Sequence, residues 1–316
     1  MNKNIIQSEE FQELIRDVNN AILDSSEVGT TALLFEPINY INNLQGKRIR
    51  PLLVILSGLS LGGNIDSLLY PAVAIELLHN FTLVHDDIMD NDDIRRGKPT
   101  VHVKWDLGTA ILAGDGLLGL AYRKILSTPN VNQSHVATLF TDALIDICEG
   151  QALDKSFETQ QNVSESKYLE MINKKTAVLI QLSCLLGAIT AGAEEEIQNK
   201  FSDFGYNIGM GFQIQDDLLD IIADESKLGK KVGSDLAMNK KTILTTKLAE
   251  SGLLVEDITE VDEFKKHLDE SGILNNVSKL VDNYFNTAYK NFDSIPENKY
   301  KTMLLVLTEY IKNRDK

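Results

Sequence analysis

Two short acidic segments carry residue types and a spacing that could do chemistry. Residues Asp86 to Asp90 read DDIMD, and residues Asp216 to Asp220 read DDLLD. Residues four apart lie on one face of a helix, so each segment presents two carboxylates in the same direction. Carboxylate oxygens are hard ligands suited to Mg²⁺, which shares its coordination with water and substrate phosphates. The pattern therefore predicts a magnesium site for a phosphorylated substrate.

The number and position of these segments strengthen that interpretation. A single DDxxD is weak evidence, because acidic clusters usually form a solvated helix face. This chain has two, and each follows an apolar stretch with helical periodicity. Carboxylates at a helix C-terminus oppose the helix dipole and cost stability unless a cation is bound there. We therefore expect the rest of the chain to bring the two segments face to face.

Basic side chains lie beside helix-breaking residues in two other places. The segment GKRIRP carries Lys47 and Arg50, and the loop IRRGKP after the first acidic segment carries Arg95 and Arg96. Each alone would usually be a solvated surface charge. Because arginine suits two-pronged contact with phosphate, the group together is a plausible anion cradle.

Composition and charge define the broad class. The chain has 316 residues, of which 43% are hydrophobic and 24% charged, so it can bury a large core. A formal net charge of −15 disfavours nucleic acid and anionic membranes as partners. The two cysteines, Cys148 and Cys184, have no CxxC spacing and are expected to be buried thiols in a reducing cytosol.

One apolar stretch could be mistaken for a membrane span. Residues 176–193 are apolar, but Gln181, Ser183 and Thr190 interrupt them, which favours a helix buried in a bundle. The N-terminal residues lack the apolar core of an export signal. We expect no transmembrane segment and a cytoplasmic protein.

Helical periodicity dominates the chain, and no run of strand alternation occurs. A helix over residues 70–90 would carry Pro71 in its first turn, and a loop rich in Gly and Lys after Asp224 would cover the site. The remaining expected helices cover residues 8–23, 31–44, 111–127, 134–158, 164–193 and 194–223, with shorter ones in 243–316. These elements predict an all-α protein.

Four motifs in order resemble one family. GKRIRP, DDIMDNDDIRRG, GFQIQDDLLD and LGKKVGSD are similar to the motifs of the trans-prenyltransferases, the isoprenyl diphosphate synthases, over residues 44–242. The resemblance implies one isoprenoid synthase domain over residues 1–316, a helical bundle around a central cavity, and a homodimer. It implies a transferase that condenses isopentenyl diphosphate with the allylic dimethylallyl, geranyl and farnesyl diphosphates.

The resemblance also assigns roles residue by residue. About three Mg²⁺ ions would be bound with the allylic diphosphate. Their ligands would be Asp86, Asp87, Asp90, Asp216, Asp217 and Asp220. Arg95 would contact the allylic diphosphate. The diphosphate of isopentenyl diphosphate would be held by Lys47, Arg50, His79 and Arg96. The positions expected near the allylic diphosphate and the nascent cation are Lys175, Thr176, Gln213, Lys230 and Lys240, of which Lys175 and Gln213 join the aspartates as catalytic residues.

The implied reaction needs no protein nucleophile. Breaking an allylic C–O bond gives a carbocation and a diphosphate, whose charge Mg²⁺ and arginines stabilise in a water-excluded site. The double bond of isopentenyl diphosphate attacks the cation, and a proton is then lost to the departing diphosphate. The lack of a Ser-His-Asp arrangement is therefore expected.

Product length would be set by the floor of the cavity. Phe81 and Thr82 precede Asp86 by about one turn, and Leu78 lies about one turn further. For packing alone Phe81 would be ordinary core, but an aromatic residue there resembles synthases of geranylgeranyl (C20) or farnesyl (C15) diphosphate. The first motif lacks the two-residue insertion of many bacterial farnesyl synthases, which favours C20.

Three other functions predict different sequence features. A longer-chain polyprenyl synthase would have a deeper floor. A subunit of a heteromeric synthase would typically have lost aspartates, and both motifs are intact here. A terpene cyclase would usually lack the GKxxRP segment and the second aspartate motif.

Overall fold

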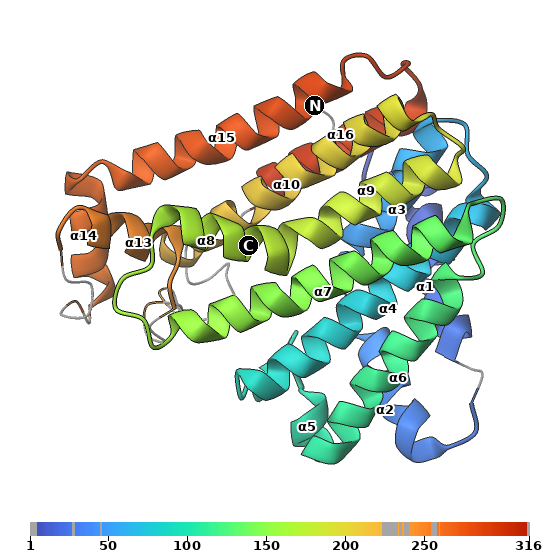
Figure 1. Cartoon of the computed structure of the whole chain (residues 1–316), viewed down its shortest axis with the longest axis horizontal. Coiled ribbons are helices and arrows are strands. Elements are labelled where there is room, and N and C mark those ends of the chain that lie inside the picture. The colour runs from blue at the N-terminus through green and yellow to red at the C-terminus, as the bar shows by residue number, and fades with distance from the viewer. Residues whose placement is uncertain are drawn as a thin grey trace. The chain divides into compact units, whose positions relative to one another are not determined.

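Helices make up most of the chain that the structure describes (Figure 1). The structure is a computed structural model, and it describes residues 5–26, 29–44, 46–222, 233, 236, 240–253, 258 and 260–314. Within these residues the strands are β1 (Ile94–Arg95) and β2 (Lys98–Pro99), an antiparallel pair in which Ile94 lies opposite Pro99. The predicted all-α fold is confirmed.

The chain divides into two compact units. The first contains residues 1–141, 183–198 and 296–306, and the second contains residues 142–182, 199–295 and 307–316. Each acidic motif belongs to a different unit, the first motif to the first unit and the second motif to the second. The single domain over residues 1–316 stays a prediction.

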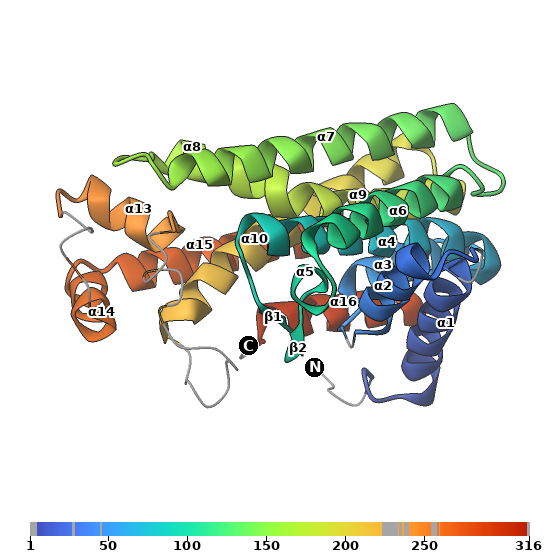
Figure 2. The same cartoon turned by 90° about the horizontal axis from the view of Figure 1, so that it is seen from below.

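The first unit is built around one long apolar helix, α4 (Ile65–Met89), which packs chiefly against α6 (Leu107–Ile125) and α3 (Ile49–Ser60). Residues 71–78 of α4 are buried all round, as expected of a helix in a bundle core. The other helices of this unit are α1 (Glu9–Ser26), α2 (Ala32–Asn43) and α5 (Val101–Lys104). In Figure 2 the hairpin β1–β2 lies beside α5.

Helix α4 begins earlier than the sequence analysis predicted. The Asn64 side chain accepts a hydrogen bond of 2.8 Å from the Asp66 N–H and caps the helix, so Pro71 lies inside it and not in its first turn. Proline there removes one backbone hydrogen bond, which this otherwise strongly apolar helix tolerates.

The second unit begins within α7 (Gln133–Phe157) and continues through α8 (Glu165–Ile172). A single π-helical turn, η1 (Asn173–Ala177), separates α8 from α9 (Val178–Thr190). The helix predicted over residues 164–193 is therefore interrupted, and isolated π turns of this kind are frequent at functional sites. The next long helix, α10 (Glu195–Ile222), carries the second acidic motif at its C-terminal end.

Four helices follow in the described C-terminal part of the chain, the last of them divided between the two units at residue 306. They are α13 (Ile243–Glu250), α14 (Val261–Glu270), α15 (Ile273–Phe292) and α16 (Lys299–Lys312). Figure 1 shows α13 and α14 near the start of α15. The rings of Phe201 and Phe204 on α10 pack on Phe292, with centroids 4.8 and 4.2 Å apart. This aromatic cluster fixes α15 against α10.

Two sequence expectations about individual segments have different outcomes. Cys184 is buried as predicted, but Cys148 is exposed, because it lies on the outward face of α7. Residues 65–89 and 165–190 are long and apolar enough to cross a membrane, yet most of each stretch is buried in the structure. A core helix passes the same test, so this is weak evidence for a membrane span.

Candidate active site

The first acidic motif ends α4 as predicted. Asp90 caps the helix, and its N–H donates a 2.8 Å hydrogen bond to the Asp86 carbonyl, so helical spacing persists through the motif. Asp86 and Asp90 are partly exposed, whereas Asp87 is 1% exposed. The motif thus combines two accessible carboxylates with one that is buried.

The hairpin β1–β2 returns Arg95 to this motif. Its Nε donates to Asp87 Oδ1 at 2.6 Å, and its Nη2 lies 2.5 Å from the same oxygen. Burial raises the pKa of Asp87 although the Arg95 hydrogen bond and charge act in the opposite direction. Arg95 therefore holds the buried carboxylate but does not fully compensate its desolvation.

The other oxygen of Asp87 is suited to a cation. Asp87 Oδ2 is buried and accepts no hydrogen bond within the described residues. An orphaned buried carboxylate oxygen is costly unless a positive charge reaches it. The described residues contain no cluster of three or more Asp, Glu, His or Cys side chains that could enclose a metal by themselves. The donor set fits Mg²⁺ completed by water and substrate phosphate.

Adjacent arginines of the hairpin point to different places. Arg96 has a positive φ of 52°, followed by Gly97 with φ of 72°. Its Nη1 donates to the Leu44 carbonyl at 3.4 Å, at the end of α2. The tight turn thus sends Arg95 to the acidic motif and Arg96 toward the GKRIRP segment.

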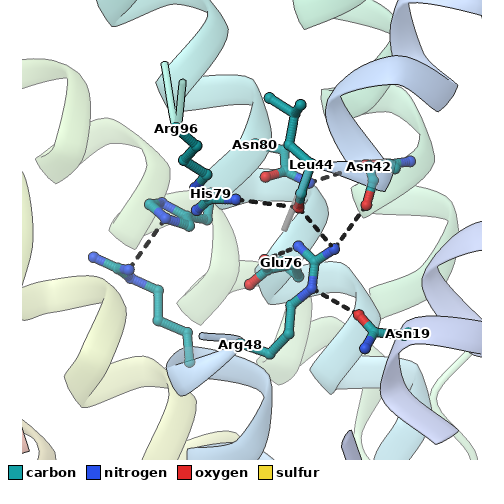
Figure 3. A network of polar contacts seen from close by, with 9 residues as sticks. Asn19, Asn42, Leu44, Arg48, Glu76, His79, Asn80 and Arg96 are labelled. Carbon is teal, nitrogen blue, oxygen red and sulfur yellow. Dashed lines mark hydrogen bonds and ion pairs between the residues drawn. The ribbon is translucent and has the colours of Figure 1, made fainter. Parts of the chain in front are cut away.

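A buried network fixes the GKRIRP segment (Figure 3). Arg48, which has a positive φ of 49°, donates from Nη1 to Glu76 at 2.6 Å and from Nε to Asn19 at 2.8 Å. Its Nη2 donates to the Asn42 carbonyl at 2.7 Å. Because the guanidinium is held from three sides, the backbone that carries the neighbouring Lys47 and Arg50 is fixed.

Arg48 was not predicted from the sequence. A usable signal was present, because Glu76 stands among apolar residues of α4, and a carboxylate there needs a cationic partner. The two side chains pair at 2.6 Å and are almost fully buried. Lys47, by contrast, is exposed.

The sequence analysis predicts that Arg50 and His79 bind the same diphosphate, and the two side chains lie side by side in the structure. Arg50 Nη1 lies 3.2 Å from His79 Nε2. Because a guanidinium only donates hydrogen bonds, Nε2 accepts, and the ring proton of neutral His79 lies on Nδ1. Burial, reinforced by the charge of Arg50 and then of Arg96, holds the pKa of His79 well below its usual 6.5. His79 is therefore neutral at physiological pH.

The second acidic motif lies on α10 in the second unit. Asp216 is exposed, whereas Asp217 and Asp220 are buried. Arg314, at the end of α16, donates to Asp216 Oδ1 at 2.9 Å and to the Phe212 carbonyl at 3.0 Å, with its guanidinium 3.7 Å from the Phe212 ring centre. A C-terminal cation therefore neutralises the most exposed aspartate of the motif.

A polar pocket of about 160 Å³ lies beside this motif, within the second unit. It is lined by several of the predicted residues, Asp216, Asp217, Lys175, Thr176, Gln213 and Lys240. Two further lining residues, Asp154 and Tyr168, were not predicted. Lys230 lies outside the described residues.

The π turn directs two adjacent lysines to different partners. Lys175 borders the pocket and forms an ion pair with Asp154 of α7. Lys174 instead pairs with Asp146 at 2.8 Å and Glu149 at 2.5 Å. A Cβ on Gly150 would lie 2.3 Å from the Lys175 backbone nitrogen, so the close approach of α7 to the π turn requires glycine. Asp154 carried no distinguishing mark in the sequence, because only folding brings it to Lys175.

The predicted chain-length residues lie on α4 and face different surroundings. Leu78 is fully buried, Phe81 is 8% exposed, and Thr82 is partly exposed with its hydroxyl bonded to the His79 carbonyl at 2.8 Å. The Phe81 ring packs against His85, with centroids 4.7 Å apart. A Cβ on Gly114 of α6 would lie 2.2 Å from His85 Nε2, so Gly114 makes room for the ring that supports Phe81.

Comparison with known proteins identifies the family and the fold. The polyprenyl synthetase family model matches residues 31–270. The chain is 39% identical to geranylgeranyl diphosphate synthase of Methanosarcina mazei, over 97% of this chain and 98% of that protein. It is 32% identical to component 2 of heptaprenyl diphosphate synthase of Bacillus subtilis, over 94% and 87%. The crystal structure of geranylgeranyl pyrophosphate synthetase from Pyrococcus horikoshii superposes with a TM-score of 0.90 at 35% identity, covering 97% and 100% of the two chains.

The fold and the two motifs define an isoprenoid synthase, and the chain belongs to the polyprenyl synthetase family. It is a prenyltransferase, as its resemblance to the trans-prenyltransferases predicted.

Proposed function

We propose that this enzyme elongates allylic diphosphates with isopentenyl diphosphate in a Mg²⁺-dependent reaction and releases a C20 product. The observation that carries the proposal is the buried, unpartnered Asp87 Oδ2 between two accessible aspartates, beside Arg95. A carboxylate oxygen in that state calls for a cation, and the partly exposed neighbours leave room for a diphosphate that shares it.

On the allylic side, the chain's residues bind and neutralise the leaving group. Asp86, Asp87 and Asp90 hold Mg²⁺, which when bound stabilises the charge that develops on the departing diphosphate. The N–H groups of Arg95 that do not contact Asp87 donate hydrogen bonds to the same diphosphate. The family resemblance implies that the six motif aspartates bind about three Mg²⁺ ions, and this remains part of the proposal.

In the second unit, the pocket supplies groups for the same step. Lys175 and Lys240 offer cations to the allylic diphosphate, and Thr176 and Gln213 present dipoles toward the forming allylic cation. The exposed Asp216 and the buried Asp220 join the metal ligands, while Arg314 occupies Asp216 before substrate arrives.

On the isopentenyl side, four residues orient the attacking double bond. Lys47, Arg50 and Arg96 bind the diphosphate, and neutral His79 accepts a hydrogen bond from Arg50 and fixes its direction. The buried Arg48 network keeps this segment in place when the anion is absent. The attack forms the new C–C bond, and the proton released from the adduct leaves with the diphosphate, so the chain need not supply a base.

A short product is supported by the packing of Phe81. The aromatic side chain, backed by His85 and Gly114, would close the floor one turn below Asp86. Leu78, fully buried on the next turn, would form a second floor if Phe81 were removed. C15 is the alternative short product.

A homodimer is supported by the outer face of α6. Leu107, Ile111 and Leu112 are large apolar residues that are 54%, 42% and 51% exposed in the isolated chain. An exposed apolar helix face of this kind is commonly buried against a second copy of the chain in a dimer. A cytoplasmic location and a single functional domain complete the proposal.

One specific observation favours a second candidate. The similarity to component 2 of a heptaprenyl synthase is consistent with a longer product or with a subunit that needs a partner. The intact aspartates of both motifs argue that this chain carries the catalytic machinery in either case.

Product analysis of the purified chain tests the proposal. Isopentenyl diphosphate is supplied with dimethylallyl, geranyl or farnesyl diphosphate, with Mg²⁺ or with chelator, and the dephosphorylated products are separated by chromatography. We expect a Mg²⁺-dependent C20 product from the chain alone. No elongation with any primer would reject an autonomous synthase, and products longer than C20 would reject Phe81 as the floor.

A further inference from the structure

Tyr168 is a buried tyrosine of α8 whose hydroxyl points at the second acidic motif. The residue is 1% exposed, and its Oη donates a short hydrogen bond to Asp217 Oδ2. A tyrosine hydroxyl carries its proton at neutral pH and a carboxylate only accepts, so Tyr168 is the donor of this hydrogen bond. This hydrogen bond to a motif aspartate gives Tyr168 a role beyond packing.

Asp217 is held by donors from several elements. Besides Tyr168 on α8, the Ile243 N–H at the start of α13 donates to Oδ2 at 3.0 Å. Gln213, one turn earlier on α10, donates from Nε2 to Oδ1 at 3.1 Å. These three donors together fix the plane of the Asp217 carboxylate.

The same contacts set the orientation of Gln213. Its Oε1 accepts a 3.0 Å hydrogen bond from Thr176 Oγ1 in the π turn, while its Nε2 faces Asp217. A flipped amide would place its oxygen against the acceptor-only carboxylate of Asp217, so the orientation with Nε2 toward Asp217 is preferred. A continuous chain of hydrogen bonds thus runs from Tyr168 through Asp217 and Gln213 to Thr176, and all four residues line the polar pocket.

We propose that Tyr168 is a positioning residue for the prenyl-transfer reaction. Its hydroxyl holds Asp217, and through it Gln213 and Thr176, in the orientation that Mg²⁺ and the allylic diphosphate need. The part of this inference that concerns turnover rests on the proposed function. Without the hydroxyl, Asp217 keeps the Ile243 and Gln213 donors but loses its buried side-chain donor to Oδ2, so its orientation is held less firmly.

The test removes only the hydroxyl, by Tyr168→Phe. We expect kcat to fall about tenfold, the factor typical of one lost hydrogen bond to a charged group. The Mg²⁺ concentration for half-maximal rate should rise several-fold, while KM for isopentenyl diphosphate stays unchanged. Independently of turnover, calorimetric titration with Mg²⁺ and inorganic diphosphate should show binding several-fold weaker than in the wild type.

A matched control is available in the same unit. Tyr289 on α15 donates a 2.7 Å hydrogen bond to Glu309 on α16, and neither residue lines the pocket. Tyr289→Phe therefore removes a comparable tyrosine–carboxylate bond and should lower thermal stability while leaving the kinetics and the calorimetry unchanged. If Tyr168→Phe behaves like Tyr289→Phe, the hydroxyl is merely structural and the proposal is overturned.

A second pair of variants decides the question if Tyr168→Phe does not fold. Thr176→Val removes the other end of the hydrogen-bond chain, and Thr176→Ser retains the donor. The valine variant should show the weaker Mg²⁺–diphosphate binding and the serine variant should not; equal binding in both contradicts the proposal. Should the wild-type chain form no prenyl product, the proposed function fails, and the calorimetry still shows whether Tyr168 positions the binding site.

Discussion

At the scale of single residues, the site is defined by charges that are buried with incomplete compensation. Asp87 keeps a raised pKa because its desolvation outweighs the help of Arg95, and His79 keeps a lowered pKa because it is buried and, in addition, lies among arginines. Such groups lower the stability of the ligand-free protein, and they contribute to binding when an anion and a cation occupy the site together. This arrangement supports the proposed diphosphate site.

The lowered pKa of His79 predicts a specific loss of stability in acid. Between the folded-state pKa and about 6.5, the unfolded chain binds a proton at this position that the folded chain does not, so the free energy of unfolding falls as pH drops through this range. His79→Gln removes that contribution. The stability difference between wild type and variant should therefore narrow between about pH 7.5 and about pH 5.5, as followed by thermal melts.

An exposed histidine serves as the control for this measurement. His135→Gln on α7 should leave the pH dependence of the melting temperature as in the wild type. Parallel pH curves for wild type and His79→Gln would show that His79 does not lie in the cationic environment described here.

Which of these residues the sequence could predict depends on how local their signals are. The aspartates, Lys47, Arg50, Arg95 and Arg96 stand in short motifs, so residue type and spacing suggest them as site residues, and their roles stay predictions. Tyr168, Asp154 and Arg48 were missed because their roles arise from contacts with residues far away in the chain. Asp154, for example, looks like any acidic residue of a helix until the π turn presents Lys175 to it.

At the scale of elements, the helices were predictable and their interruptions were not. Apolar periodicity gave the long helices with small errors at their ends, such as the start of α4 at Ile65. The π turn was invisible, because Asn173 to Ala177 have ordinary helical propensities. Its position is fixed by the approach of α7 at Gly150.

The close approach at Gly150 predicts a large effect from one added methyl group. Gly150→Ala places Cβ 2.3 Å from a backbone atom of Lys175, which cannot move as a flexible side chain could. We expect a loss of about 1–3 kcal/mol of stability, measured by denaturant unfolding, with a fall in turnover because Lys175 and Thr176 shift.

Gly119 on α6 is the matched helical control. No atom of the described residues of the same chain lies within 4 Å of a Cβ built there, so Gly119→Ala should stabilise the isolated chain by about 0.4–1 kcal/mol. A Gly150→Ala variant as stable as Gly119→Ala would disprove the tight packing of α7 on the π turn.

The contact between α4 and α6 predicts where product length is controlled. Phe81→Ala removes the ring that His85 and Gly114 support, so the product mixture should shift to chains longer than C20, as measured by chromatography. The fully buried Phe140 on α7 provides the control, because Phe140→Ala should cost a comparable amount of stability and leave product length unchanged. An unaltered product from Phe81→Ala would move the floor to another residue.

At the scale of the whole molecule, family membership follows from motif order and not from any single motif. The chain carries its basic segment, its two aspartate motifs and its Gly- and Lys-rich stretch in one order, and a family match over residues 31–270 agrees with it. Because the net charge is −15, the proposed diphosphate site would depend on local cations such as Arg50, Arg95 and Arg96.

The central claim is that both aspartate motifs serve one Mg²⁺-dependent condensation, and a rate assay of two variants tests it most directly. Asp86 and Asp216 are each accessible, so Asp86→Ala and Asp216→Ala should leave the fold intact while removing metal ligands. Asp142→Ala, at an exposed aspartate of α7, is the control. With isopentenyl and farnesyl diphosphates and saturating Mg²⁺, we predict a loss of about 10²-fold or more in kcat for each motif variant and none for the control. Near-wild-type turnover in either motif variant would contradict the account.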